Sequence, residues 1–351
     1  MKAIRSVVAA GAALALLVGC SAEGGDAPET VTVALLDSGS RTDGAWSQAW
    51  YEGAEAAQEA LGDSAIVTTT DQLAGSDALE KAGGAALSEG ARAFIIATSE
   101  APQALDRLGQ KFPDRFVCGV EPPRESYRDN VCTIYPHMEQ GAFLAGVAAA
   151  LATKTKHVGT IGAFDSPTLT AQMEGFALGV RYVDPTITVE RAYTMSLSDS
   201  GAARAAAEAQ YDAGADIIFV VVSEGRTGVF AAAEKHNGYV IGANGAWSDE
   251  APELIVTSVL YNFDLISKTM LELAAKGKLE ARSYDFTLAD GPYGELAEPV
   301  GAAGELLSAD AWSQLQDLQS AIAAGDVEIP NAHVIGQRDA ADSYDMSLLG
   351  R

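Results

Sequence analysis

The cysteine at position 20 has the sequence surroundings of a residue that becomes covalently lipidated. Cys20 follows Leu17-Val18-Gly19, and the lipoprotein signal peptidase cuts between a small residue and a cysteine whose thiol has received a diacylglycerol. The preceding apolar run, 7–18, is too short for a bilayer span of about 20 residues and is typical of a secretory signal peptide. An ordinary signal peptide with a chance cysteine is the alternative. We predict a lipoprotein signal peptide over 1–19, lipidation at Cys20, and a flexible tether over 20–30.

The two remaining cysteines, Cys118 and Cys132, are 14 residues apart and are candidates for a disulfide. Export places them in an oxidising compartment, where such bonds persist. In the chain-entropy model, a closed loop of this length stabilises a fold by about 3 kcal/mol. The alternative is a pair of buried free thiols, which are common in protein cores. We predict the disulfide.

Signatures of enzyme active sites do not occur in the sequence. It has no GxSxG elbow, no HExxH, no GxxxxGK phosphate loop, and no GxGxxG after the first predicted strand. The histidines are scattered and lack a partner at metal-ligand spacing; they are His137, His157, His236 and His333. Catalytic triads form in space rather than in sequence, so motifs alone do not exclude an enzyme. We expect no catalytic residues, no cofactor and no metal.

Length and charge narrow the class of protein. The 351 residues suggest two domains of ordinary size, and 48% hydrophobic residues are enough to form real cores. The formal net charge of −25 repels phosphate backbones, so we expect no nucleic acid partner. Solubility at a cell surface is the simplest explanation of this charge.

Short apolar runs alternate with alanine-rich helical stretches along the chain. The predicted strands are 31–37, 65–70, 93–98, 115–120, 131–135, 157–163, 187–195, 216–223, 239–243 and 254–260. The predicted helices are 45–61, 71–89, 101–111, 137–153, 169–182, 201–213, 226–235, 262–276 and 307–324. Near-continuous apolar strands that alternate with helices indicate parallel sheets covered on both faces. We predict an α/β protein of two doubly wound lobes, the second beginning near residue 157, with the carboxyl ends of the strands around one cleft.

Short motifs that follow one another between residues 31 and 300 carry a resemblance to a known family. The first is Asp43-Gly44-Ala45-Trp46-Ser47-Gln48, which precedes Tyr51-Glu52-Gly53. The others are EQGAFLAG at 139–146, GTIGAFDSP at 159–167, EGFALG at 174–179, GADIIF at 214–219, YVIG at 239–242, and AP at 251–252 before TSVL at 257–260. In this order they resemble the basic membrane protein family of bacterial lipoproteins, which includes purine-nucleoside receptors of ABC importers.

The resemblance implies the two-lobed type I fold of periplasmic binding proteins, in which the chain crosses between the lobes three times. The expected lobes are 31–136 with 261–277 for the first, and 137–260 with 278–351 for the second. The expected crossings lie near Pro136, Leu260 and Leu279.

The resemblance also places candidate ligand contacts in the first lobe. Asp43 matches the family's aspartate and can accept hydrogen bonds from ring N–H or amino groups; capping of the following helix is its alternative role. Trp46 stands where the family has phenylalanine, and its indole face suits stacking on a planar base, or it packs in the core. Ser47 keeps a smaller polar group than the family's asparagine. Thr98 and Ser99 end the third strand and are expected to face the cleft, where the family often has an aromatic residue.

Further candidate contacts lie in the second lobe. Three of them end one of its strands: Ser223, Glu224 and Gly225. The helix that follows has free N–H groups at its start, which can bind an acceptor on the ligand. Ordinary capping of that helix is the alternative role. Asn244 and Tyr261 replace an aspartate and a lysine that the family associates with ribose, and they offer neutral hydrogen bonds of about 1 kcal/mol each. Trp247 adds an aromatic ring near the same rim, or it packs beneath the loop.

Taken as a whole, the resemblance implies the substrate-binding lipoprotein of an ABC importer, anchored by lipid on the extracytoplasmic face of the cell membrane. We expect a monomer that closes on a nucleoside or nucleobase-like molecule, makes weaker demands on the ribose than its relatives do, and docks on permease subunits. The alternatives are a ligand sensor or surface adhesin with the same fold, and a surface hydrolase that acts on nucleosides.

Overall fold

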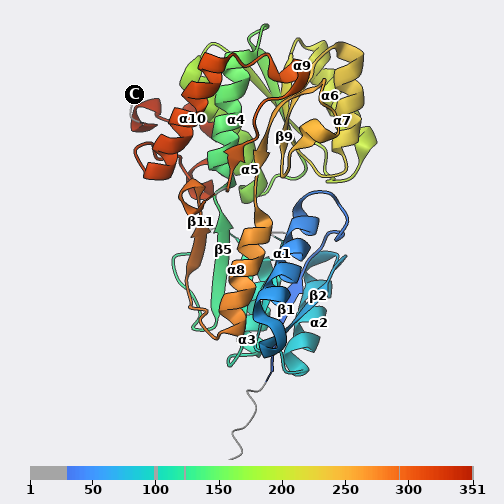
Figure 1. The fold of residues 1–351 in the computed structure, drawn as a ribbon, viewed down its shortest axis with the longest axis vertical. Coiled ribbons are helices and arrows are strands. Elements are labelled where there is room, and N and C mark those ends of the chain that lie inside the picture. Colours follow the sequence, from blue (N-terminus) through green and yellow to red (C-terminus); the bar gives the residue numbers. More distant parts are fainter. Residues whose placement is uncertain (1–29, 99–101, 122–123, 292, 350–351) are drawn as a thin grey trace, which may run out of the picture.

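The described part of the chain forms two lobes, each built around one six-stranded sheet (Figure 1). The structure is a computed structural model that describes residues 30–98, 102–121, 124–291 and 293–349. The predicted signal peptide, the predicted lipidation site Cys20, the predicted tether up to residue 29, and Ser99 lie outside these residues. The prediction of an α/β protein with two lobes, each a largely parallel sheet between helices, is confirmed.

The first lobe contains the sheet β11-β5-β4-β3-β1-β2, in which every pairing is parallel. Its strands are β1 (Val31–Leu36), β2 (Ala65–Thr70), β3 (Ala93–Ile96), β4 (Phe116–Val120), β5 (Val131–Pro136) and β11 (Ser283–Phe286). Its helices are α1 (Trp46–Leu61), η1 (Gly62–Ser64), α2 (Gly75–Ser88), α3 (Pro102–Lys111) and α8 (Phe263–Ala275). In Figure 1, α1 and α8 lie side by side on one face of the sheet. The buried side chains of α2 and α3 form a separate cluster.

The second lobe contains the sheet β12-β10-β9-β8-β6-β7, in which only β12 runs antiparallel to its neighbour among the described pairings. Its strands are β6 (His157–Gly162), β7 (Thr188–Tyr193), β8 (Ile217–Val221), β9 (Tyr239–Ala243), β10 (Ile255–Leu260) and β12 (Glu295–Leu296). Its longer helices are α4 (Met138–Ala152), α5 (Pro167–Val183), α6 (Ser200–Asp212), α7 (Arg226–His236) and α10 (Ala309–Ala324). Its shorter ones are η2 (Trp247–Asp249), η3 (Leu288–Asp290), α9 (Gly301–Gly304), α11 (Ala332–Ile335), α12 (Ala340–Ser343) and η4 (Met346–Leu349).

The packing of α4 against α5 explains why glycines recur in two of the sequence motifs. A β-carbon at Gly146 would lie 2.0 Å from the carbonyl oxygen of Phe176, and one at Gly179 would lie 2.0 Å from that of Phe143. The two helix backbones therefore touch where these glycines lie. Nearly all of α4 is buried, which is the reason that its sequence is apolar all around rather than on one face.

The boundary predicted at residue 278 is wrong, because the chain stays in the first lobe after α8. Strand β11 pairs with β5, with Tyr284 opposite Ile134, so 283–286 extends the first-lobe sheet. The third crossing therefore follows Phe286 and not Leu279. The physical cause is the alternation in this strand: the side chains of Tyr284 and Phe286 are buried in the first-lobe core, whereas Asp285 is exposed.

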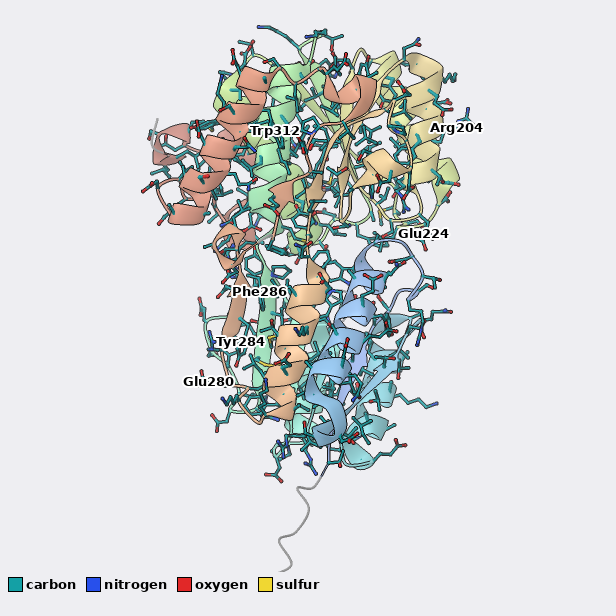
Figure 2. All side chains as sticks on the ribbon, in the orientation of Figure 1. Arg204, Glu224, Glu280, Tyr284, Phe286 and Trp312 are labelled. Carbon is teal, nitrogen blue, oxygen red and sulfur yellow. A yellow bond between two sulfur atoms is a disulfide. The ribbon has the colours of Figure 1, made fainter. Side chains whose placement is uncertain are left out.

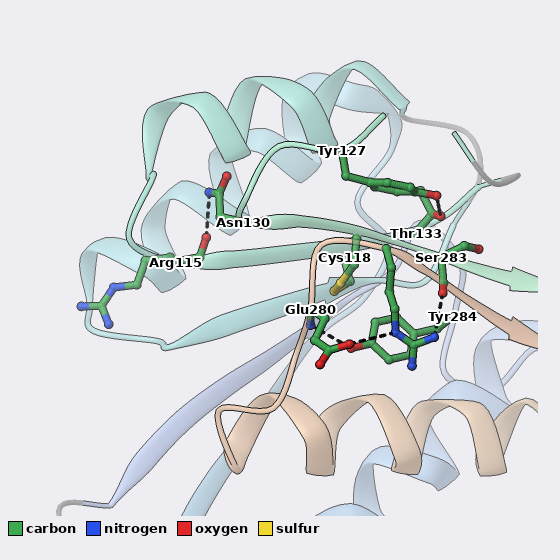
Figure 3. The surroundings of a disulfide bond; sticks show 10 residues. Arg115, Cys118, Tyr127, Asn130, Thr133, Glu280, Ser283 and Tyr284 are labelled. Carbon is green, nitrogen blue, oxygen red and sulfur yellow. Dashed lines mark hydrogen bonds and ion pairs between the residues drawn. A yellow bond between two sulfur atoms is a disulfide. The ribbon is translucent and has the colours of Figure 1, made fainter. Parts of the chain in front are cut away.

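The two cysteines of the described chain lie opposite each other on neighbouring strands. Cys118 of β4 and Cys132 of β5 are register partners, their Cα atoms are 4.5 Å apart, and their sulfur atoms are bonded (Figure 3). Both are fully buried. Close by, the backbone N–H of Glu280 donates to the hydroxyl of Tyr284 at 2.8 Å, which holds the turn between α8 and β11. The crosslink therefore joins β5, which leads into the first crossing, to its neighbour β4.

A buried carboxylate fastens the C-terminal segment to the second lobe. Glu174 of α5 is fully buried and accepts hydrogen bonds from Arg191 at 2.7 and 3.0 Å. It also accepts from the backbone N–H groups of Asp339 and Ala341 at 3.1 and 3.0 Å. Arg191 in turn donates to Asp342 at 2.9 Å. The last described helices are thus held to α5 by one ionic centre.

Candidate functional site

A cavity of about 750 Å³ lies where the two lobes face each other. Its first-lobe wall comes from the segments after β1 and β3 and from the start of α1, and it consists of Ser38, Gly39, Ser40, Asp43, Trp46, Ser47, Thr98 and Gln103. Its second-lobe wall is formed by Met138, Phe164, Ser166, Thr168, Leu169, Gln172, Leu197, Ser198, Val221, Val222, Ser223, Glu224 and Asn244. Most of these residues follow the carboxyl ends of parallel strands, where doubly wound sheets bind ligands.

Asp43 shapes the first-lobe wall by capping α1. Its Oδ1 accepts hydrogen bonds from the backbone N–H groups of Ala45 and Gln48 at 2.8 and 3.1 Å, and its Oδ2 accepts from that of Ser47 at 3.1 Å. The capping role considered for this aspartate is therefore present. Because a carboxylate oxygen can accept more than one hydrogen bond, Asp43 can still accept from a ligand at the cavity surface.

Trp46 supplies an aromatic face whose orientation is fixed. Its Nε1–H donates to the carbonyl oxygen of Ala97 at 2.6 Å. Its ring packs on Phe263, with centroids 4.3 Å apart, and on Trp50, with centroids 6.0 Å apart. Trp50 is fully buried and belongs to the core, whereas Trp46 is half-buried and lines the cavity. The indole of Trp46 is thus held in place for stacking on a planar group.

Asp37 carries a buried carboxyl group and directly precedes two residues of this wall in the sequence. Asp37 directly precedes Ser38 and Gly39, which line the cavity, and it is 1% exposed. Its Oδ1 accepts hydrogen bonds from the backbone N–H groups of Ser38 and Gly39 at 2.7 and 3.4 Å, whereas its Oδ2 has no hydrogen-bond partner among the described residues. Burial raises the pKa of Asp37 to about 6. This carboxyl group therefore changes its protonation state near pH 6.

The second-lobe wall carries three of the predicted polar residues. Ser223 and Glu224 follow β8, and Figure 2 labels Glu224 on the rim of the second lobe that faces the first. Asn244 follows β9 with a positive φ of 68°, a conformation that asparagine tolerates better than most residues. The Oδ1 of Asn244 is buried and has no hydrogen-bond partner among the described residues. A ligand with a hydrogen-bond donor at this place would satisfy it.

The structure places three of the predicted contacts away from the cavity wall. Trp247 is 2% exposed, and its ring packs edge-on against Phe230 at 5.8 Å, which matches packing beneath the loop. Tyr261 is 3% exposed, and its hydroxyl donates to the carbonyl oxygen of Met138 at 2.6 Å. Gly225 donates its N–H to the carbonyl of Leu197 at 3.1 Å. These contacts direct all three toward the protein and not toward the cavity.

Several lining residues were not predicted. Ser38 and Ser40 follow β1, and Phe164 and Ser166 follow β6, so the rule that ligands bind beyond strand carboxyl ends could have indicated them. Gln172 lies inside α5, and no sequence signal separates it from an ordinary helical glutamine.

The charge on the cavity wall is negative. Its ionisable side chains are the carboxylates of Asp43 and Glu224, and the described lining residues include no lysine, arginine or histidine. Within the described part of the chain, no group of three or more histidine, cysteine or acidic residues is arranged to hold a metal ion. The wall therefore suits a ligand without negative charge, held by hydrogen bonds and by contact with an aromatic face.

A cluster of ionisable groups lies where the chain crosses between the lobes. His137 precedes α4, and its Nδ1 is 2.8 Å from Oε1 of Glu139 while its Nε2 is 3.5 Å from Oδ1 of Asp285 on β11. Tyr135 donates to the other oxygen of Glu139 at 3.1 Å. Burial disfavours the charged imidazole, but the bonds with Asp285 and Glu139 outweigh it and raise the pKa of His137 to about 9. The cluster therefore links the first crossing to the third.

No helix in the described part of the chain combines the length and the apolar character needed to cross a membrane. Comparison with protein families gives a match over residues 30–296 to a family described as PnrA-like ABC transporter substrate-binding protein.

Individual relatives match shorter stretches. Basic membrane protein B of Borreliella afzelii is 35% identical over 135 residues, which are 38% of this chain and 40% of that protein. The ABC transporter nucleoside-binding protein BmpA of Lactococcus lactis subsp. cremoris is 36% identical over 108 residues, or 31% of each protein. The matches thus span less than half the length of these two relatives. A solved ABC transporter solute-binding protein from Aeropyrum pernix K1 has a TM-score of 0.74 and 19% identity, over 89% of this chain and 96% of that one, which shows a shared fold.

Proposed function

Since the chain belongs to the family of PnrA-like ABC transporter substrate-binding proteins, we propose that it is the lipid-anchored extracytoplasmic receptor of an ABC importer and that it binds a nucleoside or nucleobase-like molecule. The family resemblance carried by the sequence motifs and the two-lobed type I fold are confirmed. The ligand, the lipid anchor and closure of the lobes are the proposed parts.

The cavity between the lobes is the observation that carries the proposal. Its volume of about 750 Å³ lies within the range of roughly 300–1,000 Å³ that is usual for small-molecule sites. The fixed indole of Trp46 offers a stacking face beside the carboxylate of Asp43. A relative that matches 31% of the chain is named as a nucleoside-binding protein, which supports the same ligand class. A neutral heterocycle fits this combination better than a phosphorylated one.

Binding can be tested directly by calorimetry on the purified protein. We expect adenosine, guanosine or inosine to bind, and Trp46→Ala to weaken binding by about tenfold or more, because stacking of a base on an aromatic ring contributes roughly 1–3 kcal/mol. Trp312→Ala, on α10 and outside the cavity lining, is the control. If no nucleoside and no free base binds to the wild-type protein, the proposed ligand class is wrong.

The anchor is tested by fractionation of cells. Cys20→Ala should prevent lipid attachment, so the protein should be released from membranes or persist as the uncut precursor. Recovery of this variant in membranes at the processed size would exclude lipidation at this position.

A further inference from the structure

Gln172 is a buried polar residue of the cavity wall, and its amide oxygen has no hydrogen-bond partner among the described residues. It is 2% exposed and lines the cavity, yet its Oε1 has no partner among the described residues. Buried polar side chains nearly always have hydrogen-bond partners, so one without a partner requires an explanation. Because Gln172 lines the cavity, a donor group on a bound ligand can supply the missing partner.

The position of Gln172 on α5 aims it at the ligand space. Thr168 precedes it by one helical turn and also lines the cavity, so this face of α5 is turned toward the cavity. Leu169 lines the same wall and adds apolar surface beside the amide. The glutamine therefore stands among cavity residues and not against the neighbouring helix.

A second unpartnered oxygen lies at the start of the same helix. Ser166 occupies the N-cap position of α5, where a serine hydroxyl usually accepts from a backbone N–H of the first turn. Here the hydroxyl makes no such bond, and its Oγ is buried without a partner among the described residues. Three lining residues of the second lobe therefore have a buried oxygen without a partner among the described residues: Ser166, Gln172 and Asn244.

The first-lobe wall differs in this respect. The carboxylate of Asp43 accepts from three backbone N–H groups, and the indole N–H of Trp46 donates to Ala97. The Oε1 of Gln103 accepts from Ser76. Among the buried polar atoms of the described wall, those without a partner thus all lie in the second lobe. Two are amide oxygens, which accept hydrogen bonds, and the third is a serine hydroxyl, which can accept or donate.

From this geometry, and resting on the proposed function, we propose that Gln172 determines specificity: with Ser166 and Asn244 it selects uncharged ligands that present hydroxyl or amino donors to the second lobe. An amide oxygen accepts from such donors but offers no charge to an anion. The carboxylates of Asp43 and Glu224 repel a phosphate or carboxylate group in the same space. The transported class is therefore a nucleoside or a similar hydroxyl-bearing heterocycle, and not its phosphate ester.

The test replaces Gln172 by methionine, which has nearly the same shape but no hydrogen-bonding amide. Gln210→Met is the matched control, because Gln210 is also a buried glutamine of the second lobe with an unpartnered Oε1, but it does not line the cavity. Calorimetry on the full-length protein in detergent uses adenosine, inosine and guanosine, their 2′-, 3′- and 5′-deoxy forms, purine riboside, and the 5′-monophosphates. Thermal melting shows that each variant is folded.

We expect Gln172→Met to weaken binding of the tightest nucleoside by about tenfold, equivalent to about 1.4 kcal/mol, and Gln210→Met to leave it unchanged. At least one deoxy or deamino analogue should bind the wild-type protein about tenfold more weakly than its parent, and this difference should vanish in Gln172→Met. A purely structural role for Gln172 would not remove the difference. The monophosphates should bind at least a hundredfold more weakly than the nucleosides.

Failure of this inference differs from failure of the proposed function. If nucleosides bind, but Gln172→Met and wild type discriminate the analogues equally, or the monophosphates bind as well as the nucleosides, the assignment of Gln172 is overturned while the function stands. If no nucleoside binds, mass spectrometry of the compound released from denatured wild-type protein decides. A phosphorylated or carboxylated compound overturns the inference, and an uncharged polyhydroxylated one supports it.

Discussion

A β-carbon added at Gly44 of the first lobe would lie 3.2 Å from Nη2 of Arg226 in the second lobe, so the lobes approach each other closely at this point. Gly44 has a positive φ of 67° and directly follows Asp43. Arg226 is held from its own side, because Glu250 accepts from it at 2.8 and 3.1 Å and the ring of Trp247 lies 5.4 Å away. The buried Trp247 thus supports an arginine at the interface between the lobes.

The first prediction follows from this contact. Arg226→Ala removes the side chain that lies against the first-lobe loop, and it should favour an open arrangement of the lobes. We expect a larger radius of gyration by small-angle scattering. If the proposed nucleoside ligand binds the wild-type protein, its affinity for the variant should be lower by about threefold to tenfold. Arg204→Ala is the control, because Arg204 forms an exposed ion pair with Glu208 on α6. Scattering curves and affinities that match those of the wild-type protein would contradict an interlobe role for Arg226.

The second prediction concerns His137 at the first crossing. Its pKa is raised to about 9 in the folded protein, against about 6.5 in an unfolded chain, so its charged form stabilises the fold. This contribution is fully present below pH 6.5 and is lost as the pH rises through 9. The shift limits the contribution to about 3 kcal/mol. Urea unfolding of the wild-type protein and of His137→Gln should therefore give free energies of unfolding that differ most near pH 6 and converge above pH 9. A difference that does not change with pH would exclude the ionic role.

The third prediction concerns Cys118 and Cys132. Alkylation of the denatured, unreduced mature protein should find neither of them as a free thiol, because their sulfur atoms are bonded. Replacement of both by alanine should lower the free energy of unfolding by about 3 kcal/mol in the chain-entropy model. Reduction of the wild-type protein should produce a similar loss, and it should have little effect on the double variant. Two alkylated cysteines without reduction would show that the bond is not formed.

The fourth prediction concerns the ionic centre at the C-terminus. Glu174→Gln leaves Arg191 without its buried carboxylate, and the loss of one partner of a buried pair costs roughly 3–5 kcal/mol. Asp342→Asn removes the half-exposed partner of the same arginine and should cost less than about 1 kcal/mol. Chemical denaturation measures both. Equal losses in the two variants would mean that Glu174 does not anchor the segment.

The elements of this fold were predictable where their pattern was strong and local. Most strands from β1 to β10 are apolar runs of ordinary length, β7 being the polar exception, and their order along the chain indicated two parallel sheets. Strand β11 was missed because only Tyr284 and Phe286 mark it, and its pairing with β5 joins residues far apart in sequence. A short alternating strand at the edge of a sheet gives little signal until its partner is known.

The candidate site was predictable only in part, for a related reason. Asp43 and Ser223 follow strands, so the sequence indicated that they lie near the cleft. Whether a ring points into the cavity or into the core depends on packing that sequence does not display, and Trp247 and Tyr261 are examples. Gln172 was not predictable either, because only the structure shows that it lines the cavity and that its amide oxygen lacks a partner among the described residues.

The last prediction concerns Asp37, whose carboxyl group is buried beside the first-lobe wall. Burial raises its pKa to about 6, above the usual value of 3.8, so the folded protein holds this proton more tightly than the unfolded chain does. For an acid with a raised pKa, ionisation destabilises the fold. The penalty is absent below about pH 4, grows as the pH rises to 6, and is then constant at no more than about 3 kcal/mol.

Asp37→Asn keeps an oxygen acceptor for the N–H groups of Ser38 and Gly39 but cannot ionise. Relative to the wild-type protein, this variant should therefore gain stability between pH 4 and pH 6.5. Urea unfolding of both proteins across this range measures the difference, and a difference that stays flat, or that falls with rising pH, would show that Asp37 is not protonated in the folded protein near pH 5.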